Sequence, residues 1–238
     1  MASRAEEKER RRRERKAREA EETRATERSR RLRLALIGAV VAAAGVALVV
    51  ALVAGGGGSR GSKSASGGGG AAVPARKVTD LAAAARAAGC TVRSYPQADR
   101  FRGHTTAKVH YRTNPPTFGA HNPNPASDGD YAGQGTPPVG QLVHSLEHGR
   151  IQIQYRPGAP RREVGQLETL FNESVGGYGA GEYEQLFENT TKMPYAVAAT
   201  AWGHMLACPR FDPGVFDAIR AFRETYTLKG PEYIPQPE

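Results

Sequence analysis

The segment QLVHSLEHGRIQIQY, residues 141–155, concentrates polar groups that could do chemistry. It contains His144, Glu147 and His148, in a chain that has six histidines in total. On a helix, residues four apart lie about 40° from one another around the axis, so the two imidazoles share a face and the glutamate lies beside them. Imidazole and carboxylate groups placed together can ligate a metal ion or transfer protons.

A third imidazole, that of His121, lies in the irregular stretch that precedes this helix. If that stretch folds back over the helix, His121, His144 and His148 converge. Glu147 is then a fourth ligand or a group that orients an imidazole. Imidazole suits several transition metals, of which we take copper and zinc as the candidates. The alternative is a solvated polar stripe, in which one histidine interacts with the helix end.

The pattern His-x-x-Glu-His is also the signature of inverzincin metalloproteases, in which the glutamate activates a zinc-bound water. This alternative makes Glu147 a catalytic general base and requires a carboxylate ligand further along the chain. Glu224 follows His148 by 76 residues, which is a suitable spacing. The apolar residues of its predicted helix lie on the opposite side, however, which predicts an exposed Glu224.

Two methionines offer thioether sulfur, a soft ligand that favours copper(I). Met193 precedes a predicted strand, and Met205 follows His204 directly. Ordinary packing in the hydrophobic core is the alternative for both side chains. The single tryptophan, Trp202, lies on an apolar strand and is expected in the core.

The helix that carries the histidines is predicted from the helical spacing of Val139, Leu142, Val143 and Leu146, and Gly149 ends it.

Several further elements must position this helix. Residues 151–155 alternate apolar side chains with Gln152 and Gln154, which predicts a half-buried strand. Residues 114–138 are rich in Pro, Gly and Asn and form a long loop, which is either functional or disordered. Asp212 is expected to cap the last helix, with Pro213 at its first position. Helices are predicted over 78–90, 161–174 and 212–226, and strands over 106–113 and 195–202. The mixed order indicates an α+β fold, with helices packed on a small sheet.

The N-terminal third has a different character. Residues 34–54 contain no charged residue and, at 1.5 Å per residue, are long enough to cross a bilayer, so we predict a single transmembrane helix. A cleaved signal peptide is the alternative, but its apolar core is usually shorter. Residues 55–77 form a Gly/Ser-rich linker, and residues 78–238 form the compact domain. The Lys/Arg excess of residues 1–33 places the N-terminus in the cytoplasm and the domain outside it, so the protein is expected in the cell membrane.

The net charge of +9 comes mainly from this N-terminal arm, because residues 1–33 hold 14 Lys/Arg and 8 Asp/Glu. The high pI is therefore poor support for a domain that binds nucleic acid, and we expect no specific nucleic acid partner. The arm is expected to contact anionic lipid headgroups. RNA or a cytoplasmic protein is the alternative partner for the arm.

The two cysteines, Cys90 and Cys208, both lie in the part expected outside the cytoplasm, where a pair of thiols usually forms a disulfide. A dithiolate metal site is the alternative. The chain lacks the CxxC spacing that is typical of such sites.

The segments NPPTFGAH, GDY, LVHSLEHGRIQIQY and TAWGHMLAC, in this order, resemble a bacterial family known as domain of unknown function 3105. The resemblance covers about residues 80–232. It implies a single membrane anchor followed by this domain, and it makes His121, His144, Glu147 and His148 family positions. It implies no established reaction. Phe118 stands where a small hydroxyl residue is expected, and His204 where arginine is more usual.

Three hypotheses follow. The first is a membrane-anchored extracytoplasmic domain that binds copper or zinc through the His cluster. The second is a metal-dependent hydrolase that uses Glu147 as general base, and the third is a metal-free structural or binding module of the cell envelope.

Overall fold

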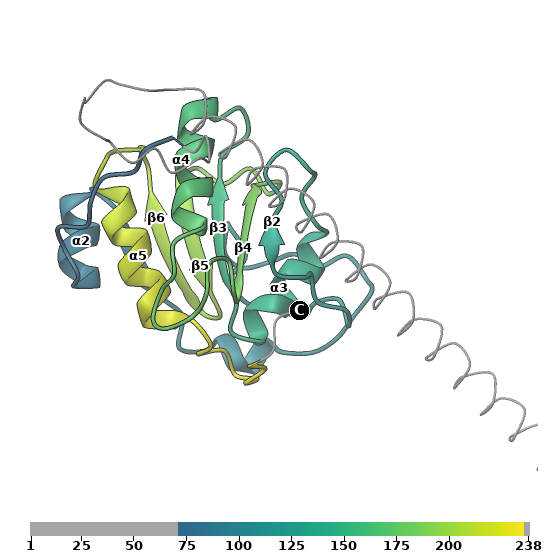
Figure 1. Ribbon diagram of the computed structural model, residues 1–238. Helices are drawn as coiled ribbons and strands as arrows, with labels where there is room; N and C mark the ends of the chain where they lie inside the picture. Colours follow the sequence, from purple (N-terminus) through teal and green to yellow (C-terminus); the bar gives the residue numbers. More distant parts are fainter. Residues whose placement is uncertain (1–70, 236–238) are drawn as a thin grey trace, which may run out of the picture. The chain divides into compact units, whose positions relative to one another are not determined.

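The computed structural model describes residues 71–235, and Figure 1 shows how their helices and strands are arranged. The predicted charged arm, the predicted transmembrane helix and most of the predicted linker lie outside these residues. Within residues 71–235, no helix combines the length and the apolar character needed to cross a membrane. The described part has the predicted α+β character, with a six-stranded mixed sheet and four α-helices.

The sheet has the strand order β1-β6-β5-β3-β4-β2. The pairs β1/β6, β6/β5 and β5/β3 are antiparallel, whereas β3/β4 and β4/β2 are parallel. The strand β3 therefore has a neighbour on each side, which suits its mostly apolar sequence. The strands are β1 (Thr91–Ser94), β2 (Gly129–Asp130), β3 (Ile151–Tyr155), β4 (Glu184–Glu188), β5 (Val197–Ala201) and β6 (His204–Cys208).

One face of the sheet and three helices enclose the larger hydrophobic core (Figure 1). The apolar stripes of the helices supply fully buried side chains such as Leu167, Ile219 and Phe222, which meet Ile151 and Ile153 of β3. These stripes are the helical periodicities of the sequence, so the helices predicted over 161–174 and 212–226 are confirmed, apart from their ends. The three helices are α2 (Leu81–Ala87), α4 (Arg161–Phe171) and α5 (Val215–Tyr226).

The other face of the sheet is covered by α3 (Val139–Glu147), which begins and ends close to the predicted positions. The amide of Gln152 donates to the Leu142 carbonyl oxygen at 2.6 Å, and that of Gln154 donates to Thr200 Oγ1 at 3.0 Å. The prediction that β3 is half-buried is therefore wrong, since both glutamines are 2 % exposed. Alternating polar residues usually mark the exposed face of a strand. Here the two glutamines are instead buried beneath α3, where hydrogen bonds satisfy their amides.

Two further predictions are wrong in detail. Residues 106–113 pair with no strand in the described chain, and their alternation instead reflects an extended segment with Val109 and Tyr111 half-buried. Periodicity reports burial on one side, and it does not require backbone pairing. The helix α5 begins at Val215 with Gly214 as its N-cap, rather than at Asp212. The Asp212 carbonyl accepts from the amide of Val215 at 2.9 Å, so this residue forms a turn before the helix.

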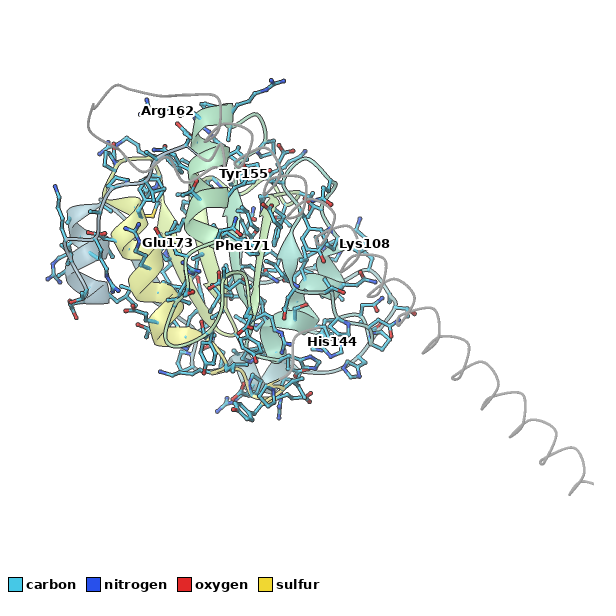
Figure 2. All side chains as sticks on the ribbon, in the orientation of Figure 1. Lys108, His144, Tyr155, Arg162, Phe171 and Glu173 are labelled. Atoms are coloured by element: carbon cyan, nitrogen blue, oxygen red, sulfur yellow. A yellow bond between two sulfur atoms is a disulfide. The ribbon has the colours of Figure 1, made fainter. Side chains whose placement is uncertain are left out.

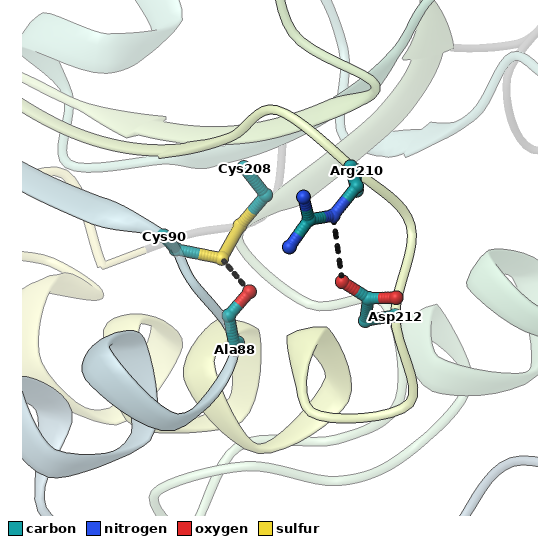
Figure 3. The surroundings of a disulfide bond; sticks show 5 residues. All are labelled: Ala88, Cys90, Cys208, Arg210 and Asp212. Carbon is teal, nitrogen blue, oxygen red and sulfur yellow. Dashed lines mark hydrogen bonds and ion pairs between the residues drawn. A yellow bond between two sulfur atoms is a disulfide. The ribbon is translucent and has the colours of Figure 1, made fainter.

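The predicted disulfide is present in the structure, between Cys90 after α2 and Cys208 at the end of β6 (Figure 3). The two half-cystines are 118 residues apart in sequence and join the turn between α2 and β1 to the end of β6. No free cysteine is present among the described residues. The Ala88 carbonyl oxygen lies 3.7 Å from Cys90 Sγ, a contact without a hydrogen bond because a disulfide sulfur carries no proton.

Residues 71–77, the end of the predicted linker, lie against the domain. The amides of Lys77 and Val78 both donate to Asp217 Oδ2 at 3.0 Å. Arg76 forms a two-pronged ion pair with Glu224 of α5, with N–O distances of 2.5 and 2.7 Å. The linker prediction thus applies at most to the residues before 71, because this segment is anchored on α5.

Candidate metal centre

Four side chains converge between α3 and the loop that precedes it: His104, His121, His144 and Glu147. One ligand atom from each lies within 4.8 Å of every other. Three of the four residues are buried, and His104 is exposed. The sequence predicts three members of this group, and His104 is the fourth.

The helix α3 positions two of these groups. Its apolar residues Val143 and Leu146 pack with Phe118 and Trp202, while Leu142 packs with Phe187 of β4. The side chains of His144 and Glu147 are left on another face of the helix, as the spacing predicts. That face is also covered, so that His144 is 4 % and Glu147 3 % exposed. His144 is labelled in Figure 2, where α3 lies below and to one side of the sheet.

The long loop closes over this face of α3, which answers a question that the sequence leaves open. The Asn122 amide donates to the Gly140 carbonyl at 3.1 Å, and Ser145 Oγ donates to the Ala126 carbonyl at 2.9 Å. Phe118 anchors the loop, because its ring is 2 % exposed and packs against Tyr95 and Phe101. A buried aromatic ring at this position is therefore compatible with a closed loop.

A short backbone pairing brings His104 beside His121. The Thr105 amide donates to the His121 carbonyl at 2.7 Å, and the His121 amide donates to the Gly103 carbonyl at 2.9 Å. The ring centroids of His104 lie 5.1 Å from His121 and 4.8 Å from His144. The two loop histidines therefore belong to one small bridge above α3.

Backbone carbonyls orient the two buried imidazoles. The Nδ1 atom of His121 lies 2.8 Å from the Gly119 carbonyl oxygen, and that of His144 lies 2.7 Å from the Asn122 carbonyl oxygen. A ring nitrogen at this distance from a carbonyl oxygen carries the proton and donates it. In a neutral ring, Nε2 is then the unprotonated atom, which is the arrangement that carbonyl partners give to metal-ligating histidines.

The Nε2 atom of His121 is completely buried and lies 2.9 Å from Glu147 Oε2. The pair is close enough for an ion pair, but the ring does not point its N–H direction at the oxygen, and Nε2 has no hydrogen-bond partner among the described residues. With Nδ1 already the donor, a neutral ring has no proton on Nε2 to share with the carboxylate, and no hydrogen bond joins the two atoms. Such a contact is favourable when a cation lies between the two atoms.

The electrostatic environment keeps His144 neutral. Burial lowers the pKa of its ring to about 4, and the neighbouring rings of His148, His121 and His104 act in the same direction. The hydrogen bond to the Asn122 carbonyl opposes this shift without reversing it. At neutral pH the ring is therefore available as a ligand without having to lose a proton.

His148 lies at the edge of this group. Its Nε2 atom is 3.0 Å from His144 Nε2 and 3.5 Å from Glu232 Oε2, in the C-terminal segment. It does not belong to the set of four that lie within 4.8 Å of one another. Arg102 approaches from the outer side, with Nε 3.9 Å from Glu147 Oε1.

The other sequence candidates are engaged elsewhere. Glu224 pairs with Arg76 and is exposed, so it is not the downstream ligand of a metalloprotease site. The Nδ1 atom of His204 lies 2.9 Å from Ser94 Oγ, and its ring stacks on Tyr226.

Both methionines are buried, Met193 at 6 % and Met205 at 1 % exposure, as ordinary core residues are. Trp202 is likewise a core residue, as predicted.

The donor set fits a transition-metal ion. A tetrahedral ion with metal–nitrogen bonds of about 2.0–2.1 Å places its ligand atoms about 3.3 Å apart. The 2.9 Å separation of His121 Nε2 and Glu147 Oε2 is close to that value, and the other separations, which are at most 4.8 Å, would have to close by up to about 1.5 Å. Three imidazoles and one carboxylate suit zinc or copper(II) better than the hard ions magnesium and calcium, which prefer oxygen.

The fold and this group of side chains define a class of protein, an α+β domain with a cluster of three histidines and one carboxylate, of which His121, His144 and Glu147 are buried. Residues 104–237 match the family described as protein of unknown function (DUF3105), and the chain belongs to this family. The match begins at His104 and includes every residue of the cluster. No curated protein and no solved structure gives a significant match.

Proposed function

We propose that this protein binds one transition-metal ion, zinc or copper, through His104, His121, His144 and Glu147. The observation that carries the proposal is the orientation of the buried rings. Two backbone carbonyls hold the Nδ1 protons of His121 and His144, which leaves Nε2 as the ligand atom of each ring: that of His121 lies 2.9 Å from Glu147 Oε2, and that of His144 lies 3.0 Å from His148 Nε2. Burial of these polar groups costs free energy unless they gain a partner, and a metal ion is a partner for all of them.

The donor types favour zinc or copper(II) over copper(I). Copper(I) selects soft sulfur ligands, and the four groups of the cluster offer nitrogen and oxygen alone. Methionine sulfur is accordingly not part of the proposal. Four protein ligands also complete a tetrahedral shell, which is the usual arrangement of a site that holds its metal rather than activating water.

The hydrolase hypothesis assigns Glu147 a different role. A general base must stand free of the metal, with an oxygen directed at bound water. The 2.9 Å contact of Glu147 with His121 Nε2 supports a role as a ligand instead. A hydrolase would require the exposed His104 to leave the metal and a water to replace it, in which case Glu147→Gln would retain metal and abolish turnover.

The test is metal content, measured by mass spectrometry on the purified full chain after zinc and copper are offered separately. About one equivalent is expected in the wild type, and little in His121→Ala and His144→Ala. The matched control is His110→Ala, which removes an exposed histidine of the same loop and should bind like the wild type.

Metal-free protein in every sample would reject this proposal and favour the third hypothesis, a metal-free module of the cell envelope. Equal loading of the wild type and of both cluster variants would place the metal elsewhere.

We also propose that residues 34–54 anchor the chain in the cell membrane, with residues 1–33 on the cytoplasmic side and the domain outside. The uncharged run and the Lys/Arg excess before it support this topology. The arm then contacts anionic lipid. Protease added to intact cells should digest the domain and spare the arm, and protection of the domain would reject the orientation.

A further inference from the structure

One contact between the cluster and its surroundings joins two imidazoles. His144 Nε2 and His148 Nε2 are 3.0 Å apart. Because His144 uses its Nδ1 proton on the Asn122 carbonyl, its neutral ring has a bare Nε2. A contact of 3.0 Å between two ring nitrogens needs one proton, so the donor is the N–H of His148. That N–H therefore covers the lone pair that a metal ion would require.

A second acceptor for the same N–H lies nearby. Glu232 Oε2 is 3.5 Å from His148 Nε2, slightly beyond a direct hydrogen bond. The side chain of His148 is 12 % exposed and that of Glu232 is 46 % exposed, so the pair lies at the rim of the cluster. A carboxylate is a stronger acceptor than a neutral imidazole. A small rotation of His148 toward Glu232 would release the lone pair of His144.

The backbone around Glu232 is fixed to the end of α3. Its amide donates to the Glu147 carbonyl at 3.0 Å, and the amide of Leu228 donates to the Gly149 carbonyl at 2.8 Å. The buried Arg150 then joins both segments, because its Nη1 donates to the His148 carbonyl at 3.1 Å and to the Ile234 carbonyl at 2.8 Å.

Gly230 packs directly on the same helix end, where a Cβ atom would overlap the Glu147 carbonyl oxygen. The backbone that carries Glu232 is therefore held at the end of α3, beside His148.

We propose that His148 is a mask on the ligand His144 rather than a ligand itself, and that Glu232 removes the mask by accepting the His148 N–H. This inference rests on the proposed metal site. Neither ring changes its charge during the exchange: one hydrogen bond, from His148 to His144, breaks and another, from His148 to Glu232, forms. Glu232 is thus a positioning residue that acts through His148 and sets the fraction of molecules able to bind metal.

The experiment measures zinc affinity of the full chain by competition with a chromophoric chelator. The variants are His148→Leu, Glu232→Ala and the double variant, with Glu188→Ala as a control that removes an exposed carboxylate at the end of β4. The apparent affinity falls in proportion to the fraction of competent molecules, so Glu232→Ala should weaken zinc binding by roughly tenfold. His148→Leu should tighten it, and the double variant should match His148→Leu, since no mask is left for Glu232 to remove.

Each alternative result is distinct. Loss of zinc binding in His148→Leu would make His148 a ligand and overturn the mask. An unchanged affinity in that variant would also overturn it, because a mask that covers His144 must lower the affinity.

If Glu232→Ala changes the zinc affinity equally in the presence and absence of His148, Glu232 does not act through His148, and that part of the proposal would be overturned. A wild type that takes up no zinc would reject the proposed metal site, and the mask with it. The melting temperature of each variant, measured without zinc, separates these results from a failure to fold.

Discussion

The ion pair between Arg223 of α5 and Glu184 of β4 offers the sharpest test of how the domain is held together. Both side chains are fully buried, and Arg223 Nε lies 2.6 Å from Glu184 Oε1. The guanidinium also donates to the carbonyls of Leu170 and Glu173 at 2.9 and 2.8 Å. Arg223 therefore joins the sheet to the C-terminal end of α4.

The perturbation is Arg223→Met, which keeps the apolar stem and removes the charge. It leaves a buried carboxylate without its cation, and Glu184 Oε2 has no hydrogen-bond partner among the described residues to compensate. Removing one partner of a buried pair costs roughly 3–5 kcal/mol, because the remaining charge stays desolvated. The matched control is Arg210→Met, whose pair with Asp212 at 3.4 Å is largely exposed (Figure 3) and should change stability by less than about 0.5 kcal/mol.

Urea unfolding gives the free energy directly. The single tryptophan, Trp202, is 5 % exposed and reports loss of the core by fluorescence. A cost below about 1 kcal/mol for Arg223→Met, with an unchanged urea dependence, would refute the assignment of Arg223 as a buried partner. A double variant, Arg223→Met with Glu184→Leu, should recover much of the loss, since an apolar pair needs no compensation.

The pH dependence has a definite sign. Burial raises the pKa of Glu184 above its ordinary value, and Arg223 opposes that shift. Without Arg223 the pKa rises further, so the folded state holds a proton that the unfolded state releases. Such a group stabilises the fold below its unfolded pKa, and that stability is lost as pH rises through the folded pKa. The stability difference between wild type and Arg223→Met should therefore narrow as pH falls from 8 to 5, and a constant difference would contradict this reasoning.

Reduction of the Cys90–Cys208 disulfide, which closes a separation of 118 residues, should cost about 4–5 kcal/mol in the chain-entropy model; urea curves with and without dithiothreitol measure it, and coincident curves would contradict it. Gly230→Ala should cost about 1–3 kcal/mol, because its Cβ would overlap the backbone of Glu147, and an unchanged melting temperature would show that the C-terminal segment is free to move. Zinc at a hundredfold excess over its dissociation constant should stabilise the wild type by about 2.7 kcal/mol and leave His144→Ala unchanged; equal stabilisation of both would indicate a different site.

The sequence predicts best the elements whose own residues carry an apolar pattern, because such a pattern can be recognised without knowing which distant residues pack against it. The helical spacing of Val139, Leu142, Val143 and Leu146 predicts α3, and the structure confirms both its bounds and the separate face of His144 and Glu147. The strand β4 was not predicted, because Glu184 and the neighbouring glutamine are polar.

Their burial depends on Arg223 and on α3, which come from other parts of the chain. A pattern within five residues contains no information about such partners.

The same distinction applies to the candidate site. The sequence singles out His144, Glu147 and His121. The first two lie on one face of a helix, and the third lies on a long loop that directly precedes this helix and can fold back over it. His104 can not be singled out, because its place depends on a backbone bridge to His121 between segments 17 residues apart. Nothing in the sequence around His104, which lies between a glycine and a threonine in a basic stretch, indicates that it contacts a helix that begins at residue 139.

The buried polar groups near the site differ in whether the protein itself supplies them with hydrogen-bond partners. The sheet face beneath α3 already satisfies its amides, since Gln152 donates to the Leu142 carbonyl and Gln185 donates to Ser145 Oγ. Nothing in that layer requires His121, whose Nε2 finds no hydrogen bond, or a carboxylate placed beside it. Apolar side chains of similar volume would fill the same space without the cost of desolvating charged and polar groups. The cluster is thus poorly explained as a device for stability, and a bound cation supplies the partner that its geometry lacks.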